Sequence, residues 1–190
     1  MKLVFATHNP NKLIEIQAMM PSNFEIVSLD DIGCSEEIPE TADTIEENAI
    51  LKVQHVNSRY KLDCFADDTG LEVEALNGEP GVHSARYAGK ERSNEGNIDK
   101  LLRNLEGIEN RNAKFKTVIA LNLEDHQYLF YGLCNGKILK ERRGSNGFGY
   151  DAVFQPEGSE KTFAEMDLQE KAKFSHRGKA FANLLDYLKE

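Results

Sequence analysis

The stretch KLVFATHNPNKLIEIQAMM, residues 2–20, indicates the class of fold most directly. Its first five residues predict a short buried strand. Asn9 followed by Pro10 is typical of a helix start, because Asn caps free amides and Pro already holds a helical φ. Apolar residues then recur on one helical face, at Leu13, Ile16 and Met20. The stretch therefore predicts a strand, a polar loop and a helix, in that order.

Strand-like and helix-like segments alternate along the rest of the chain. We expect helices from the capping box at Thr44 to Tyr60, over residues 93–105, and after a cap at Ser175. We expect strands over residues 25–29, 64–66, 71–76, 115–123, 128–133 and 150–154, with a turn at 67–70 and a hairpin joining 115–123 to 128–133. This order predicts an α/β fold with a mixed sheet, and the length of 190 residues suits a single domain over 1–190.

The charge of the chain argues against a polynucleotide partner. There are 32 Asp and Glu against 23 Lys and Arg, which gives a net charge of −9, whereas proteins that bind a nucleic-acid backbone usually carry the opposite sign. Ten of the acids lie between Leu13 and Leu51, a stretch without Lys or Arg, and basic residues gather at 137–143 and 171–179. Such a division suits a site that holds a divalent cation together with a polyanion.

The sequence also bears on location and on cysteine chemistry. It has neither an apolar run of membrane-spanning length nor a leader-like start, so we expect a cytoplasmic protein without membrane contact. Cys34, Cys64 and Cys134 form no CxxC pair that would suggest zinc or redox chemistry. Cys64 and Cys134 lie in apolar runs, and we expect both to be buried small hydrophobic residues.

Residues 7–12 form the first segment whose side chains suit the binding of a ligand. A polar loop between a strand and a helix N-terminus offers free amides and the positive end of the helix dipole to a phosphate, and Lys12 adds a full charge. No GxxxxGK[ST] is present, so this is no Walker A loop, and an ordinary capped helix is the alternative interpretation.

The second segment is Asp67-Asp68-Thr69-Gly70. Adjacent carboxylates in a strand point to opposite faces, so at most one of them serves a given site. A carboxylate at a strand end suits Mg²⁺, which takes one or two carboxylates and substrate phosphates, and Glu40 is a candidate for the second ligand. The alternative is a simple surface turn.

Two further segments suit a nucleoside. The glycines of residues 144–151 follow the order GxxGxG, which is wrong for a dinucleotide fingerprint, but Phe148 between two glycines is open to stack on a heterocycle. Lys171 precedes Ser175-His176-Arg177 at the start of the last helix, where cations oppose the helix dipole unless an anionic or acceptor-rich ligand compensates.

Together these segments closely resemble the inosine/xanthosine triphosphate pyrophosphatase family. The matching motifs run in order along nearly the whole chain, at residues 6–12, 40–41 with 46–52, 66–71, 78–87, 147–151 and 175–177, and residues 42–45 depart from the family pattern. The resemblance implies a homodimer with an elongated mixed β-sheet flanked by helices and two lobes around an active-site cleft. It also implies Mg²⁺-dependent hydrolysis of ITP, dITP and XTP to the monophosphate and pyrophosphate, which keeps deaminated purines out of DNA and RNA.

The resemblance also implies roles for the residues at matching positions. Asp68 would be the proton acceptor, and Glu40 with Asp68 would hold the metal. The residues that would contact the substrate are Thr7, His8, Asn9, Pro10, Asn11 and Lys12 at the phosphates, Thr69, and Phe148, Gly149, Tyr150, Asp151, Lys171, His176 and Arg177 around the nucleoside.

Several alternatives stay open. A carboxylate that binds Mg²⁺ is a poorer base, so Asp68 orients the attacking water in one version of the mechanism and Asp67 is a second candidate base. A donor such as His176 or Arg177 would favour purines with a C6 carbonyl over adenine. Two other functions are a Maf-like pyrophosphatase for pyrimidine or modified nucleotides and a nucleotide-binding protein without catalysis.

Overall fold

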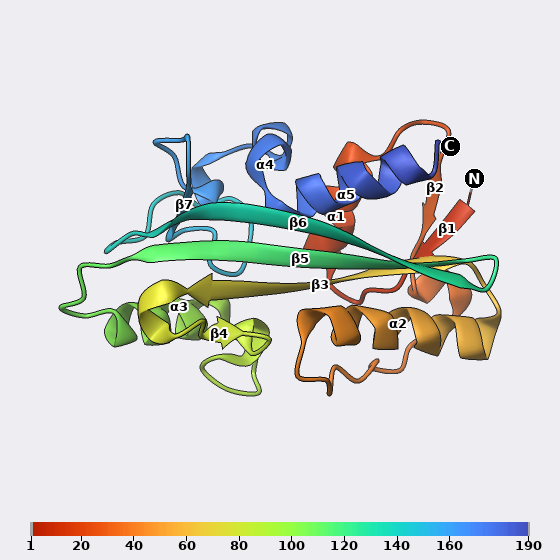
Figure 1. Ribbon diagram of the computed structural model, residues 1–190, viewed down its shortest axis with the longest axis horizontal. Coiled ribbons are helices and arrows are strands. Elements are labelled where there is room, and N and C mark those ends of the chain that lie inside the picture. Colours follow the sequence, from red (N-terminus) through yellow and green to blue (C-terminus); the bar gives the residue numbers. More distant parts are fainter. Residues whose placement is uncertain (1, 190) are drawn as a thin grey trace. The chain divides into compact units, whose positions relative to one another are not determined.

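The computed structural model describes residues 2–189 and contains a mixed sheet flanked by helices (Figure 1). The strands are β1 (Lys2–Phe5), β2 (Glu25–Val27), β3 (Cys64–Val73), β4 (Pro80–Gly81), β5 (Asn112–Leu123), β6 (His126–Ile138) and β7 (Phe154–Pro156). The α-helices are α1 (Pro10–Met19), α2 (Ile45–Tyr60), α3 (Asn94–Asn104), α4 (Leu168–Phe174) and α5 (His176–Tyr187). Short 3₁₀ helices occupy Asp30–Ile32, Glu74–Leu76, Ser84–Arg86 and Phe163–Glu165.

The sheet has the strand order β2-β1-β3-β5-β6-β7, with β4 paired to β3. β1 runs parallel to β2 and β3, whereas β4 and β7 are antiparallel to β3 and β6. The predicted α/β fold with a mixed sheet is therefore confirmed. Among the described residues, no helix is both long and apolar enough to cross a bilayer.

The chain divides into two compact units. Unit 1 comprises Met1–Asp68, Thr117–Gly132 and Arg177–Glu190, and unit 2 comprises Thr69–Lys116 and Leu133–His176. Each unit is assembled from segments that are distant in the sequence, because strands β3, β5 and β6 each contribute residues to both. The prediction of one domain over 1–190 stays a prediction.

In unit 1, strand alternation decides which helix covers which face of the sheet. Leu3, Phe5 and Phe65 share a core cluster with residues of α1 and α5, and the Phe5 and Phe65 rings stack with centroids 4.6 Å apart. Cys64 points the opposite way, and its thiol donates to the Val53 carbonyl of α2 at 3.4 Å. Helices α1 and α5 therefore lie on one face of these strands and α2 lies on the other (Figure 1).

Unit 2 has its own apolar core, in which Phe115 of β5 is central. Its ring meets that of Phe154 edge to face at 4.6 Å and lies 6.2 Å from that of Phe163. Ile98 of α3 and Tyr150 belong to the same cluster. Through Tyr150, this core anchors the glycine-rich loop 144–151.

Two expected elements are wrong. Residues 67–70 form no turn, because β3 runs unbroken from Cys64 to Val73; carboxylates are tolerated inside this strand because buried cations neutralise them, as described below. No strand spans 150–154: the Tyr150 carbonyl accepts hydrogen bonds from the amides of Val153 and Phe154, which makes a turn, and β7 begins only at Phe154. Helix α4 is an element that the sequence patterns did not predict.

Candidate functional site

The loop after β1 is held by the cap that the sequence predicts. The Asn9 side chain accepts from the amides of Asn11 and Lys12 at 3.0 and 3.4 Å, and Pro10 occupies the first turn of α1. The Asn9 amide in turn donates to Thr7 Oγ1 at 3.1 Å. Because Asn9 takes up these amides, the full charge of Lys12 is the strongest attraction that the loop offers to a phosphate.

Asp67 and Asp68 point to opposite faces of β3, as strand geometry requires. Asp67 faces α1 and α5 and lies in what we call the Asp67 network, which consists of Lys12, Glu15, Asp67 and Arg177. Asp68 faces α2 and lies in what we call the Asp68 network, which consists of Glu40, Lys52 and Asp68. Both networks belong to unit 1, so their geometry is defined within one compact part of the chain.

The Asp67 network is a buried chain of alternating charges. Lys12 Nζ lies 2.9 Å from Asp67 Oδ1, Arg177 Nε lies 2.9 Å from Asp67 Oδ2, and Arg177 Nη1 lies 2.6 Å from Glu15 Oε2. Burial alone would raise the pKa of Asp67, but the charges of Lys12 and Arg177 outweigh it and hold the pKa well below its usual range. Asp67 therefore stays ionised and fixes the Lys12 ammonium beside β3.

The Asp68 network brings two carboxylates to one ammonium. Lys52 Nζ lies 2.6 Å from Glu40 Oε1 and 3.0 Å from Asp68 Oδ1, and it also donates to the Asp67 carbonyl at 2.8 Å. Burial raises the pKa of Asp68, although the charge of Lys52 opposes this shift. The carboxylates of Glu40 and Asp68 thus converge from a loop and a strand, as the sequence predicts for a metal pair.

The loop that carries Glu40 is fixed by α2. The Asn48 side chain accepts from the Ala42 amide at 2.9 Å and donates to the Ala42 carbonyl at 3.3 Å, while Thr44 caps the helix by accepting from the Glu47 amide. Glu40 therefore precedes a segment that is held by the Asn48 side chain and by the Thr44 cap of α2. Its carboxylate oxygens and those of Asp68 are hard donors that suit Mg²⁺.

Sequence reasoning missed Lys52 and Glu15. Lys52 lies three residues after Ala49 and four before Val56, so it occupies the apolar face of α2, and a lysine there signals a buried partner. Glu15 is similarly buried beside Ile16 in α1. Both could have been found by asking which charges fall on the core side of a helix.

In unit 2, Asp151 organises a second group of predicted residues. Its carboxylate lies 2.6 Å from Lys171 Nζ and accepts from the Phe148 amide at 2.9 Å. The Lys171 ammonium lies 5.1 Å from the centre of the Phe148 ring. Gly147, with φ of +74°, has no room for a Cβ, which would overlap the Asp151 carboxylate. The loop thus holds an aromatic ring, a carboxylate and a cation together.

The remaining predicted residues occupy varied surroundings. Tyr150 is buried and its hydroxyl donates to the Ser84 carbonyl at 2.7 Å, so it supports the loop from the core. The His176 ring stacks on Phe115 at 4.4 Å, and the Arg177 guanidinium is buried in the Asp67 network. His8 is exposed and its Nε2 donates to the Glu36 carbonyl at 2.9 Å. Thr69 is partly exposed on β3, and Gly149 has φ of +60°.

Comparison with known proteins covers nearly all of the chain. The model of the Ham1 family matches residues 3–187. A dITP/XTP pyrophosphatase of Flavobacterium psychrophilum is 59% identical over 189 residues, which cover 100% of both chains. A HAM1 protein from Coxiella burnetii has a solved structure with a TM-score of 0.90 at 38% identity, covering 100% of this chain and 98% of that one. The structure of a nucleoside-triphosphatase, dITP/XTP pyrophosphatase, from Mycobacterium abscessus matches with a TM-score of 0.77 at 42% identity, covering 97% and 99%.

Proposed function

Because the chain belongs to the Ham1 family, we propose that it hydrolyses non-canonical purine nucleoside triphosphates, namely ITP, dITP and XTP, to the monophosphate and pyrophosphate. The observation that carries the proposal is the Asp68 network, in which two carboxylates and a lysine of unit 1 converge. The names of the similar proteins support the substrate class. The reaction removes deaminated purines from the nucleotide pool.

We assign proton transfer to Asp68. Attack of water on the α-phosphorus forms a bond to the water oxygen and breaks the bond to the bridging oxygen, so pyrophosphate leaves and the water proton needs an acceptor. The Asp68 side chain keeps some solvent exposure, and burial raises its pKa, which improves it as a base. Asp67 has neither property, because its side chain is fully buried and its pKa is lowered.

Asp67 instead acts as a positioning residue. It holds the Lys12 ammonium at 2.9 Å, and Arg177 balances it from the other side. In this arrangement Lys12 can neutralise charge on the triphosphate at a small cost in side-chain entropy, because its ammonium is already fixed before the substrate binds. Arg177 also stays a candidate donor to the base, because Asp67 and Glu15 engage its Nε and Nη1 and a guanidinium has five N–H donors.

Glu40 and Asp68 would hold Mg²⁺. When bound, this ion would neutralise negative charge on the triphosphate. The carboxylate pair fits a hard divalent ion because both groups already converge on one cation, the Lys52 ammonium. Lys52 then keeps the two carboxylates ionised and close together.

Phe148, Asp151 and Lys171 are proposed to receive the nucleoside. An aromatic ring offers a stacking face for a purine, and the Asp151–Lys171 pair offers both an acceptor and donors. His176 is the first residue of α5 and stays a candidate for recognition of the C6 carbonyl. We further propose that the protein is a cytoplasmic homodimer.

The test is pyrophosphate release from ITP, dITP, XTP, ATP, dTTP and UTP, with and without Mg²⁺. We expect release from the first three, dependent on Mg²⁺, together with the corresponding monophosphate. Preference for dTTP or UTP would favour a Maf-like activity, and absence of release from every nucleotide would favour a binding protein without catalysis.

A further inference from the structure

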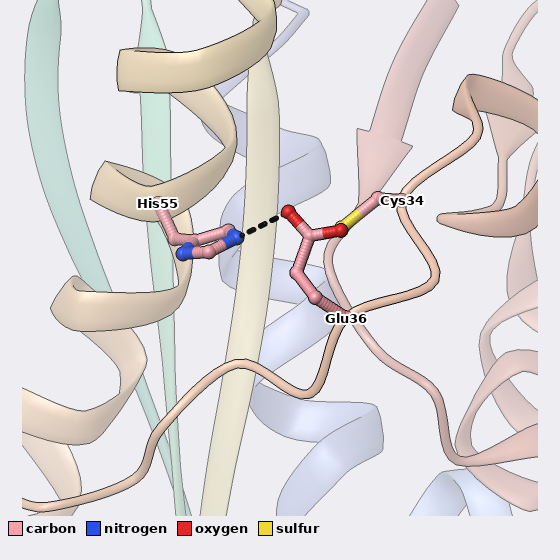
Figure 2. Close-up of side chains that lie close together, drawn as sticks. All are labelled: Cys34, Glu36 and His55. Atoms are coloured by element: carbon pink, nitrogen blue, oxygen red, sulfur yellow. Dashed lines mark hydrogen bonds and ion pairs between the residues drawn. The ribbon is translucent and has the colours of Figure 1, made fainter.

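A second group of metal-ligating side chains lies in unit 1 and has no part in the proposed reaction. Cys34 follows the 3₁₀ helix Asp30–Ile32, Glu36 comes two residues later, and His55 projects from α2. One potential ligand atom of each lies within 4.8 Å of the other two. Figure 2 shows the Glu36 carboxylate between the Cys34 sulfur and the His55 ring.

The surroundings of Cys34 differ from those of an ordinary core cysteine. Cys64 donates to a backbone carbonyl inside the apolar core, whereas the fully buried Cys34 thiol lies close to the Tyr60 hydroxyl and to the Glu36 carboxylate. The same carboxylate accepts from His55 Nε2 at 3.1 Å. The thiol and the imidazole thus lie on either side of one carboxylate (Figure 2).

We infer that Cys34, Glu36 and His55 form a binding site for a thiophilic divalent cation of the zinc class. Zinc takes thiolate, imidazole and carboxylate oxygen at about 2.0–2.3 Å, so the ligand atoms of a tetrahedral site lie roughly 3.5 Å apart. The present spread of up to 4.8 Å must therefore contract by about 1 Å when the ion binds. Three protein ligands leave the fourth position to water, and the Cys34 proton passes to solvent on binding.

The ligand set separates this site from the Glu40–Asp68 pair. Two carboxylates favour a hard ion such as Mg²⁺, whereas sulfur and imidazole select zinc and similar transition metals. The sequence gives little sign of the site, because the cysteine and the histidine are 21 positions apart and no CxxC pair is present. Only the fold of the 33–36 segment against α2 brings them together.

Arg59 supplies a competing cation that an incoming metal must displace. Its Nη1 lies 2.8 Å from Glu36 Oε1, but its side chain is 61% exposed and can turn to solvent at little cost. Replacing Arg59 therefore frees the carboxylate without removing a ligand. If the group served only as an ion-pair network, loss of Arg59 would bring no gain in metal binding.

The experiment titrates the full-length, chelator-treated protein with Co²⁺, a spectroscopic substitute for zinc, and then displaces it with Zn²⁺. We expect a cobalt–thiolate charge-transfer band that saturates at one ion per chain and disappears as zinc is added. Cys34→Ser should abolish the band. His55→Gln should weaken zinc binding by about 100-fold or more, because even the loss of an outer partner of a metal ligand costs 10–100-fold.

Cys134→Ser is the matched control, because Cys134 is also buried but lies in unit 2. This variant should keep the wild-type band, and Arg59→Gln should bind zinc more tightly than the wild type. Far-ultraviolet circular dichroism verifies that each variant is folded. If Cys34→Ser does not fold, the outcomes of His55→Gln and Arg59→Gln decide the question.

A wild-type protein without a thiolate band at saturating Co²⁺ would overturn the inference. So would a band that persists in Cys34→Ser, or zinc affinity that is unchanged in His55→Gln. None of these outcomes depends on nucleotide hydrolysis, since the readout is the metal–thiolate bond.

Discussion

The most informative stability prediction concerns Asp67→Asn, which removes one charge from the buried Asp67 network and changes its shape very little. In the wild type, the positive charges of Lys12 and Arg177 are matched by the negative charges of Asp67 and Glu15. Asn fills nearly the same volume as Asp, but the network then contains one positive charge that no carboxylate balances. Removal of one partner from a buried ion pair costs about 3–5 kcal/mol.

We expect the lower end of that range, about 3 kcal/mol, for Asp67→Asn, because the amide oxygen still accepts one hydrogen bond. This loss is a large share of the free energy of unfolding of a typical protein, which is about 5–15 kcal/mol. The assay is urea unfolding followed by circular dichroism. Asp43→Asn is the control, because Asp43 is exposed, and it should change the free energy of unfolding by no more than about 0.5 kcal/mol.

The double variant Asp67→Asn with Arg177→Met provides a second check on the charge balance. It restores that balance, with one positive charge at Lys12 and one negative charge at Glu15, so its destabilisation should be smaller than the sum of the two single changes by at least about 1 kcal/mol. Destabilisation of less than about 1 kcal/mol by Asp67→Asn, or strict additivity in the double variant, would refute the idea that this network is balanced by charge.

Three further predictions concern other parts of the chain. Lys171→Met should raise the KM for dITP about tenfold or more, since it leaves Asp151 without its 2.6 Å partner, while Lys173→Met on the exposed side of α4 should not. Gly147→Ala should cost about 1–3 kcal/mol in urea unfolding and displace the Asp151 carboxylate, because a Cβ overlaps it; unchanged stability would contradict the close approach of Asp151 to this glycine. Burial raises the pKa of the Cys64 thiol to about 12, so a thiol reagent at about pH 8 should modify Cys64 only after unfolding, as peptide mass analysis can show.

Much of the fold follows from local sequence patterns. The Asn9–Pro10 start of α1 and the Thr44 cap of α2 lie where the pattern predicts, because both depend on neighbouring side chains and amides. The opposite facing of Asp67 and Asp68 also follows from strand geometry alone. What the pattern could not reveal is that residues 67–70 stay within β3, because the cations that neutralise them come from Lys12, Lys52 and Arg177, far away in the sequence.

In the candidate site, too, some features follow from the sequence and others depend on tertiary contacts. Glu40 and Asp68 were predicted as a pair and lie on one ammonium, but that ammonium belongs to Lys52, which lies in a matching motif and was given no role. Arg177 was expected at the nucleoside, which stays a prediction, and its pairing with Asp67 and Glu15 was not foreseen. Long-range ion pairs of this kind depend on tertiary packing, which residue spacing does not contain.

The central claim is that Asp68, and not Asp67, accepts the proton during hydrolysis. Its most direct test is the rate of pyrophosphate release from dITP by Asp68→Asn at saturating Mg²⁺, with the folded state verified by circular dichroism and Asp43→Asn as the control. We predict that kcat falls by about 10²–10⁴-fold or more while the fold is kept. A kcat within about tenfold of the wild type would contradict this assignment.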